Sequence, residues 1–283
     1  MQDTRIRLGL IGDNIASSQS PRLHEIAGRL SGLKVTYERL VPPRRGQTFD
    51  EVFDACIADG FTGINVTYPY KERVVARLTV PDPAIAAVGA CNTVLFASDP
   101  PRGFNTDFTG FVAAFRNSFG AGTQPGRVAM IGAGGVGKAV AFGLAQLGCR
   151  QIRLFDRDQA RAEGLAQSVR KAAEGLTVDV CASAEEATDA ADGLINCTPV
   201  GMVGYPGSAV PDGALKTARW AFDAVYTPVD TQFLVAARSA GLAIMSGYEL
   251  FFYQGVDAFR LFTGEEVDQQ ALRRQLKDSE GAP

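Results

Sequence analysis

Lys71 and Asp107 are the residues of this chain whose types and positions best suit the movement of a proton. Lys71 follows an apolar run, "GINVTY" (63–68), that predicts a buried strand, and α/β proteins bind ligands beyond the carboxyl ends of such strands. A lysine partly removed from water there has a lowered pKa, because burial disfavours its charged form. Asp107 ends the strand-like segment "GFNTD" (103–107) and would counter that shift and orient the amine. The alternative is that Lys71 is a solvated lysine at the start of a helix, the ordinary environment of this residue type.

A glycine-rich turn has the spacing of a dinucleotide-binding site. Gly132, Gly134 and Gly137 fit the pattern G-x-G-x-x-G. The apolar run "RVAMI" (127–131) predicts a strand before them, a helix of small residues follows, and Asp156 ends the next predicted strand. These surroundings make the pattern specific, because the glycines let the backbone approach a pyrophosphate and the helix N-terminus offers unpaired N–H groups.

Asp156 also predicts which dinucleotide is bound. An acid at this strand end can hydrogen-bond both ribose hydroxyls of NAD, but it would face the 2′-phosphate of NADP. Two like charges about 4 Å apart cost on the order of 4 kcal/mol at an effective dielectric constant near 20, or roughly a thousandfold in affinity. Arg157 could reduce this cost by turning toward the phosphate. NAD is therefore the expected cofactor, with weaker use of NADP.

Several other kinds of catalytic site are excluded by the sequence. The glycine turn also fits the phosphate-binding loop of nucleotide hydrolases, but Ala139 follows Lys138 where serine or threonine must bind Mg²⁺. His24 is the only histidine, and no cysteine lies in a C-x-x-C pair, so a zinc site is not expected. No Tyr-x-x-x-Lys pair is present. His24 lies in the first predicted helix, far from any strand end, and is expected to be structural.

The elements that must position these residues alternate between strand and helix in both halves of the chain. Up to about residue 107 the order βαβαβαβ is predicted, which implies a mostly parallel sheet. A second α/β alternation follows, and two helices that separate at Gly264 end the chain. Ser20 is expected to cap the first helix, with Pro21 at its first position, and another helix is expected to begin near Lys71.

Composition limits the partners and the compartment. The chain has 283 residues with 46% hydrophobic residues and a net charge of −3, so no basic surface for nucleic acid is expected. No apolar run approaches the roughly 20 residues of a membrane span, and the first residues lack the pattern of a signal peptide. The odd number of cysteines predicts buried, reduced thiols. A cytoplasmic protein, monomeric or homodimeric, with no nucleic-acid or membrane partner is expected.

Several short motifs together resemble those of one family. "NVTYPYK" (65–71) is similar to the Asn-Val-Thr-x-Pro-(Phe/Tyr)-Lys signature of the shikimate dehydrogenase family, which includes quinate dehydrogenases. "SSQSP" (17–21), "GACNT" (89–93), "FNTD" (104–107) and "NCTPVGM" (196–202) resemble further motifs of that family in the same order, as do "YTPVDT" and "YQGVDAFRLFTG". The resemblance extends over nearly the whole chain.

The resemblance implies roles for individual residues. Lys71 and Asp107 would be the proton-transfer pair, and Ser18 and Ser20 would bind the substrate carboxylate. The ring hydroxyls would be held by Thr67, Asn92, Asp107 and Gln254, with Asn65 and Tyr226 supporting the pocket. The cofactor would contact Gly132, Gly134, Gly135, Val136, Gly137, Asp156, Arg157, Thr198, Val225 and Gly247. Asn65 and Asn92 have a structural alternative, which is to fasten strand ends or turns, and Ser20 could be only a helix cap.

The resemblance also implies two domains. Residues 1–107 and 247–283 would form a substrate-binding catalytic domain containing a parallel sheet, and residues 108–246 would form a Rossmann domain that binds NAD. The C-terminal helices would return to the first domain. The fold class is therefore α/β.

The chain departs from the commonest family pattern at three places. NADP-using members carry Asn-Arg-Thr where this chain has "FDRD", and Ala-Ser-Arg types where it has "GVGK" (135–138). Both differences favour an NAD-linked paralogue, and such members act on quinate, shikimate or both, often in catabolism. Phe108 replaces a usual glycine and could reshape the rim of the pocket. Ser20 favours shikimate as the substrate, whereas a threonine at this position would favour quinate more.

The leading hypothesis is an NAD-dependent dehydrogenase that reversibly oxidises shikimate, a small polyhydroxylated carboxylic acid, to 3-dehydroshikimate. Alternatives are a quinate or dual quinate/shikimate dehydrogenase and an enzyme for an amino-substituted analogue of shikimate. A sensor without turnover is a further alternative, against which the intact pair of Lys71 and Asp107 argues.

Overall fold

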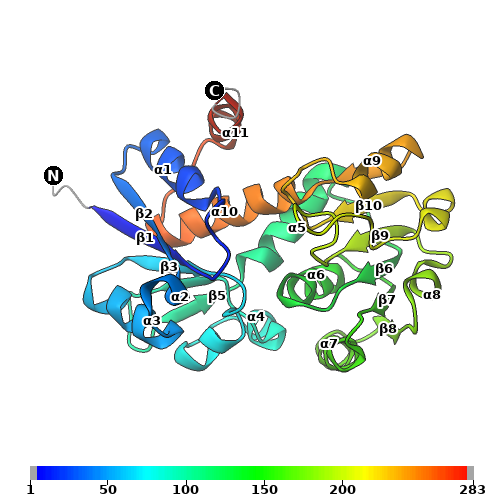
Figure 1. Ribbon diagram of the computed structural model, residues 1–283, viewed down its shortest axis with the longest axis horizontal. Coiled ribbons are helices and arrows are strands. Elements are labelled where there is room, and N and C mark those ends of the chain that lie inside the picture. The colour runs from blue at the N-terminus through cyan, green and yellow to red at the C-terminus, as the bar shows by residue number, and fades with distance from the viewer. Residues whose placement is uncertain (1–4, 279–283) are drawn as a thin grey trace. The chain divides into compact units, whose positions relative to one another are not determined.

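The computed structural model describes residues 5–278, which form two compact α/β units. One unit runs to Thr106 and resumes at Gly255, and the other spans Asp107–Gln254. The divisions fall within α5 (Thr106–Phe119) and α10 (Gly247–Thr263), so each of these helices contributes to both units (Figure 1). Across the described residues, no helix combines the length and the hydropathy that a membrane span requires.

The sheet of the first unit is mixed. Its strands, in spatial order, are β2 (Val35–Leu40), β1 (Ile6–Ile11), β3 (Gly63–Val66), β4 (Thr93–Leu95) and β5 (Arg102–Phe104). The first three are parallel, as predicted, whereas β4 pairs antiparallel with both β3 and β5. Only residues 96–101 join β4 to β5, and because a parallel connection needs a dozen or more residues, these strands form a hairpin.

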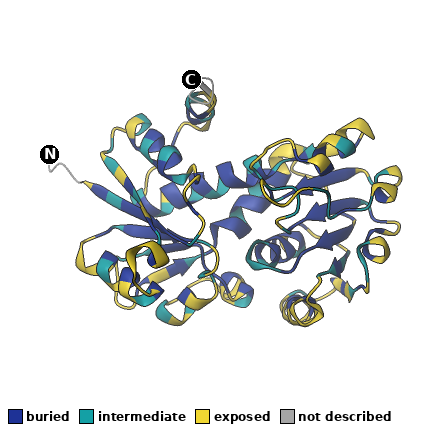
Figure 2. Ribbon diagram, viewed as in Figure 1, coloured by how far each residue is buried: buried dark blue, intermediate teal, exposed yellow. Residues whose placement is uncertain are grey.

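Helices cover this sheet and close its core. They are α1 (Ser20–Leu30), α2 (Pro42–Arg45), α3 (Phe49–Ala58), the 3-10 helix η1 (Arg73–Arg77), α4 (Pro83–Val88), the second part of α10 and α11 (Gln269–Asp278). On one face, Leu8 and Leu10 of β1 share a buried cluster with Ala258 and Phe262 of α10. The central strands β1 and β3 are accordingly almost entirely buried (Figure 2). The C-terminal helices therefore complete the core of the first unit.

The second unit is a parallel sheet in Rossmann order. Its strands, in spatial order, are β11 (Ala243–Met245), β10 (Trp220–Asp223), β9 (Gly193–Asn196), β6 (Arg127–Ile131), β7 (Gln151–Phe155) and β8 (Thr177–Val180). All pairings are parallel. The surrounding elements are α5, α6 (Gly135–Gln146), α7 (Gln159–Ala172), α8 (Ala184–Thr188), η2 (Asp212–Lys216), α9 (Gln232–Ser239) and the first part of α10. The strand order reverses between β6 and β9, where such sheets bind ligands beyond the carboxyl ends of the strands.

Two helix starts differ from the sequence-based expectation. Gln19, not Ser20, is the N-cap of α1, and the Gln19 side chain makes no capping hydrogen bond. The expected helix at Lys71 is instead the short 3-10 helix η1, which begins at Arg73. Tyr68 and Pro69 form an exposed turn between the end of β3 and this helix. The break at Gly264 is confirmed, with a left-handed φ of 76°.

The cysteines are core residues, as predicted. All five are buried free thiols. Burial raises the pKa of Cys56, Cys91 and Cys149 to about 12. Since the thiolate is the reactive form, these side chains are poor nucleophiles at neutral pH.

His24 is a core residue as well. Its side chain is 1% exposed, and its ring stacks on Tyr37 with centroids 5.0 Å apart. Phe259 and Phe262 of α10 also lie against it. Nδ1 is buried without a hydrogen-bond partner. Burial lowers the pKa of His24 from 6.5 to about 3, so the imidazole is neutral in the folded protein and is a weak base.

The buried histidine predicts an acid-sensitive contribution to stability. Between its folded and unfolded pKa values the unfolded chain binds more protons, so stability is present above pH 6.5 and is lost as the pH falls. From pH 7 to pH 5 this loss amounts to about 2 kcal/mol. His24→Phe keeps the ring and removes the titration. Denaturant unfolding at both pH values measures the free energy of unfolding. Between pH 7 and pH 5 this free energy is expected to fall by about 2 kcal/mol less in the variant than in the wild type. Equal falls in the two proteins would contradict this account.

Candidate active site

The strand ends of the first unit bring most of the predicted substrate residues to one edge of its sheet. Thr67 follows β3 directly, and Asn92 precedes β4. Because β4 runs antiparallel to β3, its start lies at the edge where β1 and β3 end. Phe104 ends β5 at this edge too, since β5 is antiparallel to β4, and Thr106 begins α5 two residues later. The mixed sheet therefore explains how motifs far apart in sequence meet.

A buried network of hydrogen bonds joins these motifs. Asn65 accepts a hydrogen bond at Oδ1 from the Tyr37 hydroxyl, 2.8 Å away, and donates from Nδ2 to Asn92 O at 3.1 Å and Thr93 Oγ1 at 3.0 Å. Asn92 Oδ1 accepts from the backbone N–H of Thr106 at 2.7 Å and from its hydroxyl at 3.1 Å. Both asparagines therefore fasten strands and turns, the structural role considered above. Their contact with substrate stays a prediction.

Ser18 and Ser20 lie together before α1. Ser18 Oγ donates to Ser20 Oγ at 3.2 Å and accepts from Ser20 N at 3.3 Å. Ser20 occupies the first turn of α1 and does not cap it. Ser18, and not Ser20, thus accepts from the first N–H of the helix, so the alternative that Ser20 is a helix cap is wrong.

The backbone around Lys71 is fixed on several sides. Cys91 N donates to Lys71 O at 2.9 Å, and Tyr70 N donates to Thr67 O at 2.9 Å. The Tyr70 hydroxyl donates to Asp13 Oδ1 at 2.6 Å, and its ring stacks on Phe49 with centroids 4.8 Å apart. The segment that carries Lys71 is therefore held to the ends of both β1 and β3.

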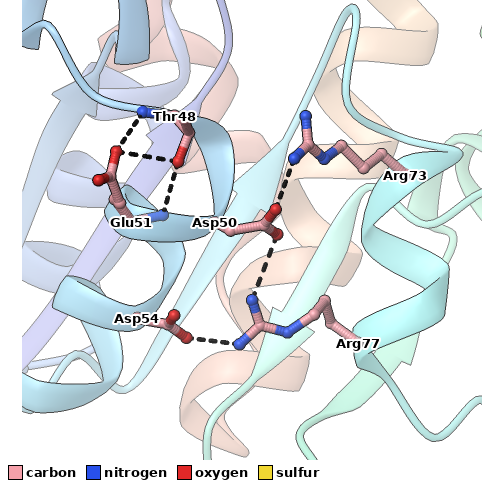
Figure 3. A network of polar contacts seen from close by, with 6 residues as sticks. All are labelled: Thr48, Asp50, Glu51, Asp54, Arg73 and Arg77. Atoms are coloured by element: carbon pink, nitrogen blue, oxygen red, sulfur yellow. Dashed lines mark hydrogen bonds and ion pairs between the residues drawn. The ribbon is translucent and has the colours of Figure 1, made fainter.

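An ion-pair network fixes the segment just after Lys71 (Figure 3). Asp50 of α3 accepts hydrogen bonds from Arg73 and Arg77 of η1, and Asp54 accepts a second one from Arg77. The hydrogen bond from Arg73 is the main cause of a lowered pKa at Asp50. These side chains are partly exposed, so each pair alone stabilises the fold little. Together they tie η1 to α3 and restrict the position of Lys71.

The glycine turn of the second unit follows the dinucleotide fingerprint in its geometry. Gly132 has φ of 106°, and a Cβ there would lie 2.7 Å from Cys197 C. A Cβ on Gly137 would lie 2.4 Å from Gly132 O, so this glycine lets α6 pack on the turn. Gly134, the N-cap of α6, has φ of −73°, and a Cβ there would lie in open space. Neither backbone strain nor packing requires glycine at 134, where it serves as the N-cap of α6 and leaves open space beside the turn.

Asp156 is held beside this turn. Its Oδ2 accepts from Ala133 N at 2.7 Å, and its Oδ1 accepts from Asp158 N at 2.8 Å. Arg157, the next residue, is exposed. Gly135 and Val136 form the first turn of α6, whose N-terminus has no side-chain cap. Unpaired N–H groups and a carboxylate of fixed orientation thus lie at the end of β6 and β7, where the fold predicts a dinucleotide.

A buried carboxylate that the sequence analysis missed organises the neighbouring strand ends. Asp223 ends β10 and is 0% exposed. Its Oδ1 accepts from Asn196 Nδ2 at 2.9 Å and Val225 N at 3.0 Å, and its Oδ2 accepts from the Thr231 hydroxyl at 2.6 Å. Asn196 in turn accepts at Oδ1 from the backbone and hydroxyl of Thr198, at 2.9 and 2.7 Å. One acid within an otherwise apolar strand was the signal that could have identified it.

Substitution of Asp223 is expected to lower the stability of the protein. Burial raises the pKa of Asp223 to about 6, while its three donors pull the pKa down. Asp223→Ala leaves those donors without an acceptor and is expected to lower the free energy of unfolding by about 3 kcal/mol. Asp223→Asn can still accept two of the bonds and sheds a buried charge, so it should lose less than half as much. Equal losses in chemical denaturation would show that the hydrogen bonds are not the cause.

The remaining predicted residues also lie in the second unit. Val225 O would lie 2.4 Å from a Cβ on Gly247, so the start of α10 packs against the end of β10. Tyr226 stacks on Phe251 of α10 with centroids 5.3 Å apart. Gln254 Nε2 donates to Phe251 O at 3.0 Å. Asp107 lies in the first turn of α5, where the helix dipole stabilises a carboxylate.

Comparisons with known proteins identify the family. Residues 10–94 match the family model described as the shikimate dehydrogenase substrate binding domain, and residues 247–277 match that of the shikimate 5′-dehydrogenase C-terminal domain. Residues 127–210 match the model of a coenzyme F420-dependent NADP oxidoreductase. The quinate/shikimate dehydrogenase (NAD(+)) of Corynebacterium efficiens is 39% identical over 282 residues, covering 96% of this chain and 98% of that protein. The chain belongs to the shikimate/quinate dehydrogenase family.

Further members of the family use either dinucleotide. The shikimate dehydrogenase (NADP(+)) of Pseudarthrobacter chlorophenolicus is 35% identical over 94% of this chain and 92% of its own length. Among solved structures, quinate dehydrogenase from Corynebacterium glutamicum in complex with NAD has a TM-score of 0.88, 35% identity, and coverage of 97% and 99% of the two chains. Shikimate 5-dehydrogenase from Thermus thermophilus in complex with NADP(H) and shikimate has a TM-score of 0.81 and 32% identity, with the same coverage. The predicted α/β class and family are confirmed, and the protein is an NAD(P)-dependent oxidoreductase.

Proposed function

We propose that this protein oxidises shikimate reversibly to 3-dehydroshikimate, with NAD as the preferred cofactor. The observation that carries the proposal is the placement of Asp156, whose carboxylate is fixed by Ala133 N and Asp158 N at the end of β7. An acid held there favours the two ribose hydroxyls of NAD over the 2′-phosphate of NADP. Arg157 allows weaker use of NADP.

The residues of the glycine turn fit the cofactor. Gly134 leaves space for a pyrophosphate, and the uncapped N-terminus of α6 supplies N–H donors from Gly135, Val136 and Gly137. The proposed cofactor contacts are completed by one residue after each of three strands. They are Thr198 after β9, Val225 after β10 and Gly247 after β11. NAD, when bound, accepts the hydride from the carbon that bears the reacting hydroxyl.

The substrate roles follow from the chemistry of a polyhydroxylated acid. Ser18 and Ser20 bind the carboxylate, and the ring hydroxyls contact Thr67, Asn92, Asp107 and Gln254, with Asn65 and Tyr226 supporting them. Lys71 accepts the proton of the C3 hydroxyl, and Asp107 orients the amine. Residues 1–107 and 247–283 would thus form the substrate-binding catalytic domain, and residues 108–246 the NAD-binding domain. We place the enzyme in the cytoplasm, as a monomer or homodimer.

Quinate is the second candidate substrate. The observation in its favour is that two of the relatives above are named for quinate, and both are described with NAD. Quinate carries the same carboxylate and a matching set of ring hydroxyls, so the same hydrogen-bonding groups serve it. Ser20, in a position where threonine would favour quinate more, is the reason to rank shikimate first.

The proposal is tested by NADH or NADPH formation, measured by near-ultraviolet absorbance, with shikimate or quinate and NAD or NADP. The highest kcat/KM is expected for shikimate with NAD. A higher kcat/KM for quinate would retain the mechanism and reverse the substrate order. Reduction of NADP in preference to NAD would contradict the role of Asp156. Turnover of an amino-substituted analogue alone, or no turnover of any of these acids, would reject the proposed substrate.

A further inference from the structure

Arg39 is a charged residue close to the proposed carboxylate site that none of the assigned roles uses. It lies near the carboxyl end of β2, and its side chain is on the same face of the strand as that of Tyr37, two residues earlier. Its Nη2 donates to Ser18 O at 2.7 Å. Within residues 5–278 it has no carboxylate partner at ion-pair distance, in contrast to Arg7, which pairs with Glu38 at 3.0 Å.

Tyr37, two residues before Arg39 on the same face of β2, connects this strand to Asn65. Its hydroxyl donates to Asn65 Oδ1 at 2.8 Å. Burial raises the pKa of Tyr37, and a side-chain hydrogen bond with Ser20 and the positive charge of Arg39 act in the opposite direction. The hydrogen bond from Arg39 Nη2 to Ser18 O, 2.7 Å long, places the guanidinium next to the residue whose hydroxyl contacts Ser20.

The serine pair alone lacks one property that a carboxylate needs. Ser18 and Ser20 can donate hydrogen bonds, but both are neutral, and Ser18 already donates to Ser20 at 3.2 Å. A carboxylate that leaves water requires compensation for its charge as well as hydrogen bonds. The guanidinium at the Ser18 carbonyl provides a positive charge, and it also holds the loop that carries the first hydroxyl.

We propose that Arg39 determines the preference of this enzyme for a substrate that carries a negatively charged carboxylate, by placing its guanidinium beside the Ser18–Ser20 hydroxyl pair and fixing the Ser18 loop. This inference rests on the proposed function, whose substrate is such an acid. Arg39 favours monoanionic polyhydroxylated acids over the corresponding esters and amides. It takes no part in proton or hydride transfer.

The test compares Arg39→Met and Arg39→Lys with Arg29→Met, a control that removes an equally charged, exposed side chain from the far end of α1. For shikimate, Arg39→Met is expected to raise KM about tenfold with little change in kcat, since a partly exposed charge-assisted interaction is lost. Arg39→Lys should recover part of the loss, and Arg29→Met should match the wild type. For the methyl ester of shikimate, Arg39→Met should lose much less kcat/KM than it loses for the acid, because only the hold on the Ser18 loop is removed.

Two outcomes would overturn the inference. Equal losses on the acid and the ester would mean that Arg39 only holds the loop, and no loss on the acid would mean that it has no role. Calorimetric binding of shikimate separates this from failure of the proposed function. If the wild type shows no turnover of shikimate but binds it about tenfold more tightly than Arg39→Met, the proposed function fails and the inference stands. Equal affinities, or no binding, would overturn the inference.

Discussion

Lys71→Ala is expected to lower kcat for shikimate oxidation by about two to four orders of magnitude while KM changes less than about threefold. The proton of the C3 hydroxyl must leave as the hydride is transferred, and the proposed site has Lys71 as its acceptor. Several residues other than Lys71 hold the substrate ring, so loss of the amine should affect the transition state more than binding. Steady-state NADH formation at saturating substrate measures the effect.

A matched control and a rescue make this result specific. Lys216→Ala removes an exposed lysine from η2 and should leave kcat unchanged. Addition of methylamine should restore part of the activity of Lys71→Ala, because a small amine can occupy the space left by the side chain. Near-normal turnover of Lys71→Ala would contradict the mechanism. A fall in activity accompanied by lost thermal stability would point instead to damage of the segment held by Tyr70 and Asp13.

Asp156→Ser is expected to change cofactor preference by the second-largest factor. The ratio of kcat/KM for NAD to that for NADP should fall about a hundredfold to a thousandfold, since the repulsion of a 2′-phosphate costs on the order of 4 kcal/mol. Arg157, already next in the chain, becomes available to the phosphate. Most of the change should come from improved use of NADP. Initial rates with each cofactor at fixed shikimate give the ratio.

Asp158→Ser is the matched control for this substitution. Asp158 lies two residues further on, is exposed, and accepts hydrogen bonds from Ala160 N and Arg161 N as the N-cap of α7. Serine can also cap a helix, so the control removes the same charge while keeping the local structure. Its NAD to NADP ratio should equal that of the wild type. A similar shift in both variants would mean that net charge, and not a contact with the ribose, sets the preference.

Local patterns predicted the parts of the fold that depend on local structure. The glycine turn, Asp156 and the strands on either side lie within one continuous stretch, and turn chemistry, helix start and strand period all indicate the same unit there. Alternation of strand and helix likewise predicted the parallel sheet of the second unit. The break between the C-terminal helices was predicted correctly at Gly264, which adopts a left-handed conformation. This preference belongs to glycine itself and so can be read from one residue.

Features that depend on long-range packing could not be predicted in this way. The antiparallel pairing of β4 with β5 follows from the short connection between them. The length of that connection could be used only once the ends of both strands were known. Tyr37 and Asp223 bind groups that are 28 and 27 residues away in the sequence, so no local pattern connects them. Ser20 satisfied the rule for a helix cap, yet its hydroxyl pairs with Ser18. Tertiary contacts decided each of these cases.

The central claim is that a hydride leaves C3 of shikimate for NAD. Shikimate carrying deuterium at C3 tests it directly, by mass spectrometry of the reduced cofactor after a single incubation with the enzyme. The account predicts that the reduced cofactor gains one deuterium and that the product is 3-dehydroshikimate without the label. Reduced cofactor that carries no deuterium, or the absence of reduced cofactor, would contradict it.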